Sequence, residues 1–225
     1  MNNGQWTMDK NQASSVVGLP PRICVIDYGM SNLRSVRHAF EFLGADARII
    51  DSPSDLAGAD AFVLPGDGAF GPAMENLQAR GWLEPIHTAI SKGTPFLGIC
   101  LGMQLLFESS EEMGEYRGLR ILRGRVKKFP TNAGKIPQIG WNQLGVAESS
   151  KFLAGVPDGA YAYFVHSYYC EADDDGVVAA QTEYGISYAS VVEKDNVWGA
   201  QFHPEKSGAD GLQMLRNFMD FTRGA

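Results

Sequence analysis

The segment Gly98-Ile99-Cys100-Leu101-Gly102 carries the most distinctive chemistry in this sequence. It places a cysteine between an apolar run and a helix-forming run, with a glycine two residues away on either side. This is the form of a nucleophile elbow, in which small residues permit a tight turn from strand to helix. The turn puts the sulfur at a helix N-terminus, where the positive end of the helix dipole favours a thiolate. The spacing therefore predicts that Cys100 is an activated nucleophile.

A thiolate nucleophile needs a base, and His203 is the best placed of the four histidines. It follows the apolar run at residues 197–202 and precedes Pro204, so it is expected at the end of a strand, where ligands bind in parallel sheets. Glu205 lies two residues further on. The imidazole can face the sulfur while the carboxylate holds the other ring nitrogen, which is the arrangement used in covalent acyl transfer. We predict a triad of Cys100, His203 and Glu205.

Acyl transfer also needs hydrogen-bond donors for an oxyanion. The turn Gly66-Asp67-Gly68 can present backbone N–H groups, and the N–H of Leu101 directly follows the nucleophile. A carboxylate at Asp67 would oppose a developing oxyanion unless it is paired or points away.

The other titratable groups predict less. Cys24 and Cys170 lack the glycine setting of Cys100, and we expect them to serve packing. Three cysteines far apart are too few for a disulfide framework or a zinc site, which indicates free thiols in a reducing compartment. The acidic run at residues 173–175 has no histidine beside it, so we predict no metal and no cofactor.

The elements that must position these residues alternate in type. Apolar runs at residues 23–27, 48–50, 61–64 and 95–99 are separated by helical stretches at 31–43, 72–80 and 83–92, which predicts a parallel sheet covered on both faces. Residues 103–108 continue the elbow as a helix. After residue 110, short strands are expected at 123–129, 138–146, 161–169, 177–182, 187–192 and 197–202, followed by a C-terminal helix. We predict a three-layer α/β fold whose central sheet is mostly parallel, with additional antiparallel strands in the C-terminal half.

Composition sets outer limits on function. Residues 1–20 are polar and lead into Pro20-Pro21, so we expect a flexible N-terminal extension and a single domain over residues 21–225. The formal net charge of −7 disfavours nucleic acid and anionic membranes as partners. No apolar run approaches the about 20 residues of a membrane span, and the first ten residues lack the profile of a secretory signal. A cytoplasmic protein is expected.

The elbow and the late His-Pro-Glu resemble the class I (triad) glutamine amidotransferases. Within that class, five segments in the same order are similar to the glutaminase subunits of imidazole glycerol phosphate synthases: residues 25–36, 64–70, 98–109, 140–142 and 201–207. The resemblance extends from residue 23 to about residue 221. Asp67 departs from it, because these subunits usually have valine there.

This resemblance implies an activity and a site. Cys100 attacks the side-chain amide of glutamine, His203 transfers the proton and Glu205 orients His203, which yields ammonia and then glutamate from a thioester. The residues implied in binding glutamine are Gly66, Asp67, Gly68, Leu101, Gln104, His166, Ser167 and Tyr168.

The resemblance also implies a partner, a cyclase subunit of (β/α)8-barrel fold in a heterodimer. This subunit uses the ammonia to make imidazole glycerol phosphate and aminoimidazole carboxamide ribonucleotide in histidine biosynthesis. The residues implied to face it are Gly140, Trp141, Asn142, Tyr163 and Lys206.

Two alternatives stay open from the residues alone. The first is a glutaminase subunit of another synthase, serving anthranilate, pyridoxal phosphate or nucleotide synthesis; residues 25–36 and 140–142 argue against it. The second is a cysteine protease or chaperone-like domain of related architecture. Such a domain typically has histidine directly after the nucleophile, where this sequence has Leu101.

Overall fold

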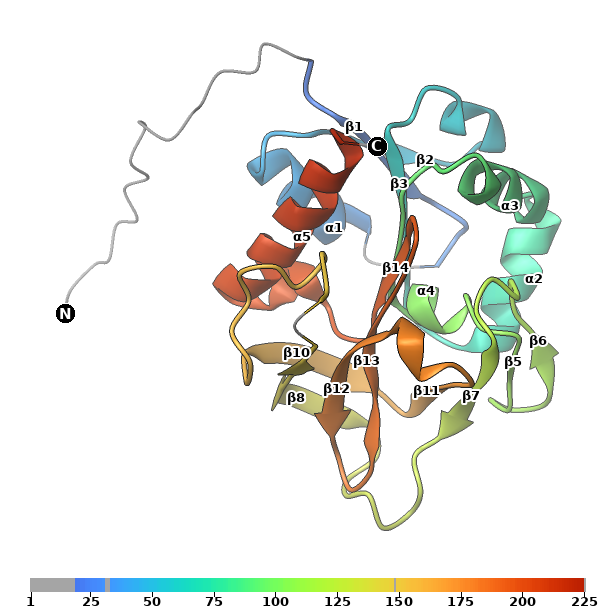
Figure 1. The fold of residues 1–225 in the computed structure, drawn as a ribbon. Helices are drawn as coiled ribbons and strands as arrows, with labels where there is room; N and C mark the ends of the chain where they lie inside the picture. The colour runs from blue at the N-terminus through green and yellow to red at the C-terminus, as the bar shows by residue number, and fades with distance from the viewer. Residues whose placement is uncertain (1–18, 31–32, 148, 225) are drawn as a thin grey trace.

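Parallel strands form the centre of the described part of the molecule (Figure 1). The computed structural model describes residues 19–30, 33–147 and 149–224. In spatial order these strands are β2 (Asp46–Ile50), β1 (Arg22–Ile26), β3 (Ala61–Gly66), β4 (Phe96–Cys100) and β14 (Val197–Ala200). The first four confirm the predicted parallel sheet, whereas β14, expected among the hairpin strands of the C-terminal half, pairs parallel to β4.

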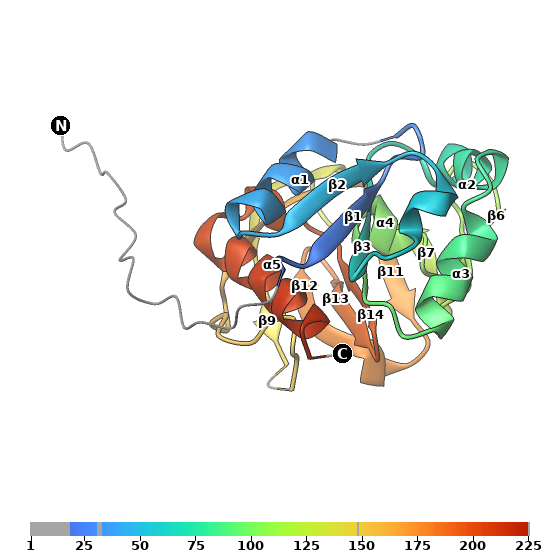
Figure 2. The same ribbon diagram turned by 90° about the horizontal axis from the view of Figure 1, so that it is seen from above.

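Helices cover both faces of these strands, which gives the predicted three layers (Figures 1 and 2). One face packs against α1 (Leu33–Phe42) and α5 (Gly208–Thr222). The other packs against α2 (Phe70–Ala79), α3 (Leu83–Ser91) and α4 (Leu101–Gln104). Successive strand residues alternate between these two cores, so a strand buried on both faces has to be apolar throughout.

The antiparallel strands extend the sheet beyond β14. In order they are β13 (Ser187–Lys194), β11 (Tyr168–Ala172), β7 (Gly124–Lys128), β5 (Ser109–Ser110) and β6 (Tyr116–Arg117), of which β5 runs parallel to β7. Two more, β12 (Val178–Glu183) and β9 (Gly145–Val146), pair beside β13. A separate two-stranded ribbon consists of β8 (Gln138–Gln143) and β10 (Tyr161–His166). The described residues also form three short 3-10 helices, η1 (Pro53–Leu56), η2 (Asp175–Val177) and η3 (Pro204–Lys206).

Two of the predicted strands are each divided into two strands in the structure, so their predicted bounds are wrong. The strand expected over residues 161–169 is divided at Ser167 into β10, which pairs with β8, and β11, which pairs with β7 and β13. The strand expected over residues 138–146 is divided at Leu144 into β8 and β9. Buried positions continue to alternate from β10 into β11, so that break carries no signal in the pattern, whereas the apolar positions change phase between Trp141 and Leu144.

The helix expected over residues 103–108 is also too long, because α4 ends at Gln104. The carbonyls of Leu105, Leu106 and Phe107 accept hydrogen bonds from backbone N–H groups of residues 119–122 instead of continuing a helix. Long-range pairing of this backbone outweighs its local helix propensity.

Some predictions lie outside the described residues. They include residues 1–18 of the expected extension and Ser31, the expected start of the first helix, so the division into extension and domain stays a prediction. In the part of the chain that the structure describes, no helix has both the length and the apolar character that a membrane span requires.

Candidate active site

Cys100 ends β4 in a strained backbone conformation, with φ 54° and ψ −111°. A positive φ at a residue other than glycine is costly and is typical of functional sites. The flanking glycines allow it. A Cβ atom at Gly98 would lie 2.6 Å from the carbonyl oxygen of Gly102, and one at Gly102 would overlap the carbonyl oxygen of Leu64. The turn from strand to helix is therefore as tight as an elbow requires.

The structure brings His203 and Glu205 together beside this cysteine. His203 Nδ1 lies 2.9 Å from Glu205 Oε1, and the two side chains are 4% and 1% exposed. Burial lowers the pKa of His203, but interactions with the Cys100 sulfur and the Glu205 carboxylate outweigh it and raise the pKa to about 10. Nδ1 is held by Glu205, whereas the buried Nε2 has no hydrogen-bond partner among the described residues and is available to exchange a proton with a bound substrate.

Gln201 is a residue of the site that the sequence analysis missed. It is fully buried, and its Nε2 lies 3.9 Å from the Cys100 sulfur. Its Oε1 accepts from Gln104 Nε2 at 3.1 Å, and the same Gln104 nitrogen donates to the Tyr168 carbonyl at 3.0 Å. This buried chain of amides places an N–H donor on the nucleophile. Gln201 begins the segment 201–207 noted above, but the segment gives no signal that its side chain contacts Cys100.

A cavity of about 290 Å³ opens at the sulfur. Cys100 and all eight residues expected to bind substrate line it: Gly66, Asp67, Gly68, Leu101, Gln104, His166, Ser167 and Tyr168. The carboxyl ends of β3 and β4 and the break between β10 and β11 thus meet at one place. The volume is at the small end of ligand pockets, which suits a molecule of amino-acid size.

Glu112 also lines this cavity and was missed from the sequence. Its Oε2 accepts a hydrogen bond of 2.7 Å from the N–H of Phe70, at the start of α2. Burial raises the pKa of Glu112, although this backbone hydrogen bond lowers it. The residue stands in a polar stretch between short strands, and no motif or spacing distinguishes it from Glu111 beside it.

His166, the second buried histidine at this site, has a pKa that is shifted in the opposite direction from that of His203. Its Nδ1 lies 2.8 Å from the Tyr168 carbonyl oxygen and its Nε2 lies 3.3 Å from the Tyr188 hydroxyl, which in turn bonds to Gln138 Oε1 at 3.0 Å. Burial lowers the pKa of His166 to about 4, although the hydrogen bond to the Tyr168 carbonyl raises it. The imidazole therefore holds the pocket backbone and carries no charge at neutral pH.

The remaining acidic and thiol groups lie as follows. Asp67 is exposed to solvent at the cavity. Cys24 and Cys170 are buried, and burial raises the pKa of both thiols, in agreement with packing roles. Among the residues that the structure describes, no three His, Cys, Asp or Glu side chains are grouped so as to hold a metal ion.

The residues expected to face a partner lie mostly on the β8–β10 ribbon. Trp141 pairs with Tyr163 across the ribbon, with ring centroids 6.1 Å apart. The outer face of the ribbon exposes three large apolar side chains: Ile139 is 62% exposed, Trp141 55% and Tyr161 53%. Gly140 has open space where a side chain would be, and Lys206 is exposed on η3. The Asn142 side chain instead turns inward.

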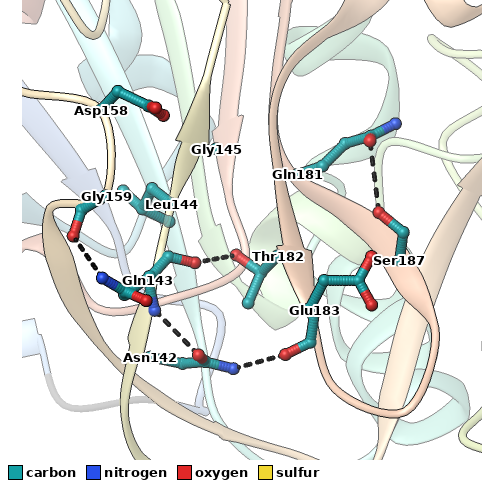
Figure 3. Close-up of a pocket in the computed structure, with 10 residues that line it drawn as sticks. All are labelled: Asn142, Gln143, Leu144, Gly145, Asp158, Gly159, Gln181, Thr182, Glu183 and Ser187. Carbon is teal, nitrogen blue, oxygen red and sulfur yellow. Dashed lines mark hydrogen bonds between the residues drawn. The ribbon is translucent and has the colours of Figure 1, made fainter.

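The Asn142 side chain lines a second cavity, of about 390 Å³ (Figure 3). Asn142 Nδ2 donates to the Glu183 carbonyl at 2.9 Å, and Thr182 Oγ1 donates to the Gln143 carbonyl at 3.0 Å. None of the residues lining this cavity belongs to the triad. These hydrogen bonds join β8 of the ribbon to β12. The cavity therefore lies at the contact between these two strands.

A strained cysteine at a strand end, a buried His-Glu pair and a small pocket have the arrangement that is used in covalent acyl transfer. The sequence model described as glutamine amidotransferase class-I matches residues 24–221. The chain therefore belongs to the class-I glutamine amidotransferase family.

Individual relatives agree with this assignment. The chain is 50% identical over 196 residues to the imidazole glycerol phosphate synthase subunit HisH of Desulfitobacterium hafniense (strain DSM 10664 / DCB-2), covering 87% of this chain and 92% of that one. It is 49% identical over 200 residues to the protein of the same name from Chlorobaculum tepidum, covering 88% of this chain and 100% of that one. A solved structure of PurLQS from Thermotoga maritima shares the fold at a TM-score of 0.71, with 22% identity, covering 90% of this chain and 99% of that one.

Proposed function

We propose that this protein is the glutaminase subunit of an imidazole glycerol phosphate synthase. It hydrolyses glutamine to glutamate and ammonia and supplies the ammonia to a cyclase subunit in histidine biosynthesis. The observation that carries the proposal is the buried His203–Glu205 pair, whose imidazole interacts electrostatically with Cys100, at a pocket of amino-acid size that Cys100 lines. Relatives about 50% identical over nearly their whole length bear the name of that subunit.

The first half-reaction forms a thioester. The Cys100 thiolate attacks the carbonyl carbon of the glutamine side chain, and backbone N–H groups of residues 66–68 and Leu101 donate to the oxyanion. His203 Nε2 gives its proton to the amide nitrogen as the carbon–nitrogen bond breaks. Ammonia leaves, and a γ-glutamyl group stays on the sulfur.

The second half-reaction restores the enzyme. His203, now neutral, takes a proton from water while the oxygen of that water attacks the thioester carbon. The carbon–sulfur bond breaks, glutamate leaves, and the thiolate and the imidazolium form again. Glu205 holds Nδ1 throughout, which keeps Nε2 directed at the sulfur and stabilises the charged ring.

The pocket suits the ammonium group of a free amino acid. Gln104 uses both of its N–H bonds, on the Tyr168 carbonyl and on Gln201, so only its carbonyl oxygen is left for a ligand. Glu112 adds a carboxylate to the same cavity. Both groups accept hydrogen bonds from a ligand and neither offers a donor, so we place the α-ammonium group of glutamine between them.

We propose that the cyclase subunit is a (β/α)8-barrel that forms a heterodimer with this chain and binds the outer face of the β8–β10 ribbon. Exposed Ile139, Trp141 and Tyr161 give that face the aromatic and apolar character of an interface core. The ribbon also contacts the site, because the Val165 carbonyl lies 4.0 Å from the Cys100 sulfur and the Tyr163 carbonyl accepts from the N–H of His203. Docking there would close the pocket end at which ammonia leaves.

Glutamine hydrolysis, measured with and without the cyclase subunit and its nucleotide ligand, tests the proposal. We expect slow hydrolysis alone and fast hydrolysis in the complex. Glu112→Gln should raise KM for glutamine about tenfold or more with a small change in kcat, since it weakens ammonium binding. Glu115→Gln, an exposed neighbour, is the matched control. Failure to pair with the cyclase, combined with activation of a different synthase, would refute the assignment.

A further inference from the structure

Tyr28 carries a buried hydroxyl with no hydrogen-bond partner among the described residues. The side chain is fully buried, just beyond the end of β1. An unpaired buried polar group costs about 1–3 kcal/mol, and native proteins rarely keep one without a use. Tyr188 shows the ordinary case, because its equally buried hydroxyl contacts both Gln138 and His166.

The unpaired hydroxyl lies directly against the turn that is expected to bind the oxyanion. A Cβ atom at Gly66 would lie 2.6 Å from the Tyr28 oxygen, so that position requires glycine. Met30 packs in the same way on Gly68, where a Cβ atom would lie 2.7 Å from its terminal methyl carbon. Residues 28 and 30 thus support the 66–68 turn along its length.

Tyr28 supports this turn from behind. Gly66, Asp67 and Gly68 line the substrate cavity, whereas Tyr28 is not among the lining residues. Burial, followed by the charges of Asp67 and Cys100, raises the pKa of Tyr28. It therefore keeps its proton and is a hydrogen-bond donor at every pH at which the protein works.

Peptide geometry supplies the missing acceptor. The N–H and C=O of one peptide unit point in opposite directions. When a peptide of the 66–68 turn directs its N–H at an oxyanion in the cavity, its carbonyl is directed behind the turn, away from substrate and water. A buried carbonyl there needs a donor. The Tyr28 hydroxyl is a donor on that side.

We propose that Tyr28 is a positioning residue for the oxyanion. Its hydroxyl donates to a backbone carbonyl of the Gly66–Gly68 turn when that turn presents its N–H to the tetrahedral intermediate. The hydroxyl is unpaired in the resting arrangement and paired during catalysis, so its bond stabilises the transition state more than the free enzyme. This inference rests on the proposed glutaminase activity.

The test compares Tyr28→Phe with the wild-type chain in complex with the cyclase. We expect kcat for glutamine hydrolysis to fall about tenfold, less than the effect of removing a direct oxyanion donor, with KM changed less than about twofold. The midpoint of thermal unfolding should stay the same or rise, because no resting-state bond is lost. Tyr188→Phe is the matched control, and it should lose stability because its hydroxyl is bonded.

Alkylation of Cys100 by iodoacetamide distinguishes an effect on the oxyanion from an effect on the nucleophile. The sulfur displaces iodide without forming an oxyanion, so the alkylation rate reports on the nucleophile alone. Tyr28→Phe should be alkylated at the wild-type rate. Wild-type kcat in Tyr28→Phe would overturn the proposal, as would slower alkylation, or a loss of stability like that of Tyr188→Phe. If wild-type protein with cyclase hydrolyses no glutamine, the proposed function itself fails, and this inference fails with it.

Discussion

Acidification should destabilise the protein through His166. Burial lowers its pKa in the folded state from 6.5 to about 4, so between these values the unfolded chain binds a proton that the folded chain excludes. The stabilisation is complete above pH 6.5 and is lost as the pH falls towards 4. Proton linkage between those two pKa values costs about 2 kcal/mol at pH 5 and about 3 kcal/mol at pH 4, relative to pH 7.

Urea unfolding of wild type and His166→Gln at pH 7, 6, 5 and 4 measures this effect. The glutamine variant keeps every carboxylate, so the difference between the two unfolding free energies isolates His166. The wild-type advantage should shrink by about 2 kcal/mol between pH 7 and pH 5. His203 does not add to this loss, because its raised pKa of about 10 stabilises the fold in acid and ceases to do so only as the pH rises through that value.

The matched control is His87→Gln, which removes an imidazole from the exposed side of α3. It should leave the pH dependence of stability as it is in wild type. A constant difference between wild type and His166→Gln over the whole pH range would refute the reasoning, because it would show that the folded protein admits the proton as readily as the unfolded chain.

Three further changes test other parts of the structure. Ser207→Ala removes a buried hydroxyl that accepts from the Tyr163 N–H and donates to the His203 carbonyl. Chemical denaturation should show that the free energy of unfolding falls by about 2 kcal/mol or more. An unchanged free energy of unfolding would mean that these groups find other partners. Trp141→Ala should weaken cyclase binding about tenfold or more in calorimetry while the uncomplexed protein keeps its melting temperature; unchanged affinity would place the interface elsewhere. Gly98→Ala should abolish glutamine hydrolysis or folding, since its Cβ atom would lie 2.6 Å from a backbone oxygen, and full activity would contradict the elbow geometry.

The parallel half of the fold and the nucleophile could be predicted because their signals are local. Strands buried on both faces must be apolar throughout, and an elbow needs small residues at Gly98 and Gly102, where the structure leaves no room for a side chain. The strand end before His203 was also predictable, but its nearness to Cys100 was not. That nearness follows from the parallel pairing of β14 with β4, for which the sequence gives no local signal.

Other features could not be predicted because they depend on contacts distant in sequence. The division of β10 from β11 at Ser167 follows from pairing with different partner strands, while the residue pattern stays the same on both sides. Glu112 reaches the site from a stretch without a motif, and Gln201, although it begins the similar segment 201–207, contacts the site through residues distant in sequence. Tyr28 gave no signal either, because an aromatic residue after a buried strand is ordinary packing material until its unpaired hydroxyl is seen behind Gly66.

The central claim is that Cys100 forms a thioester with the side-chain carbonyl of glutamine. Acid quenching of the complex with its cyclase during turnover, followed by peptide mass spectrometry, tests this most directly. We predict the added mass of one γ-glutamyl group on the peptide that contains Cys100 and none on the peptides of the buried Cys24 and Cys170. Continued turnover with no adduct on Cys100, or an adduct on either other cysteine, would contradict the claim.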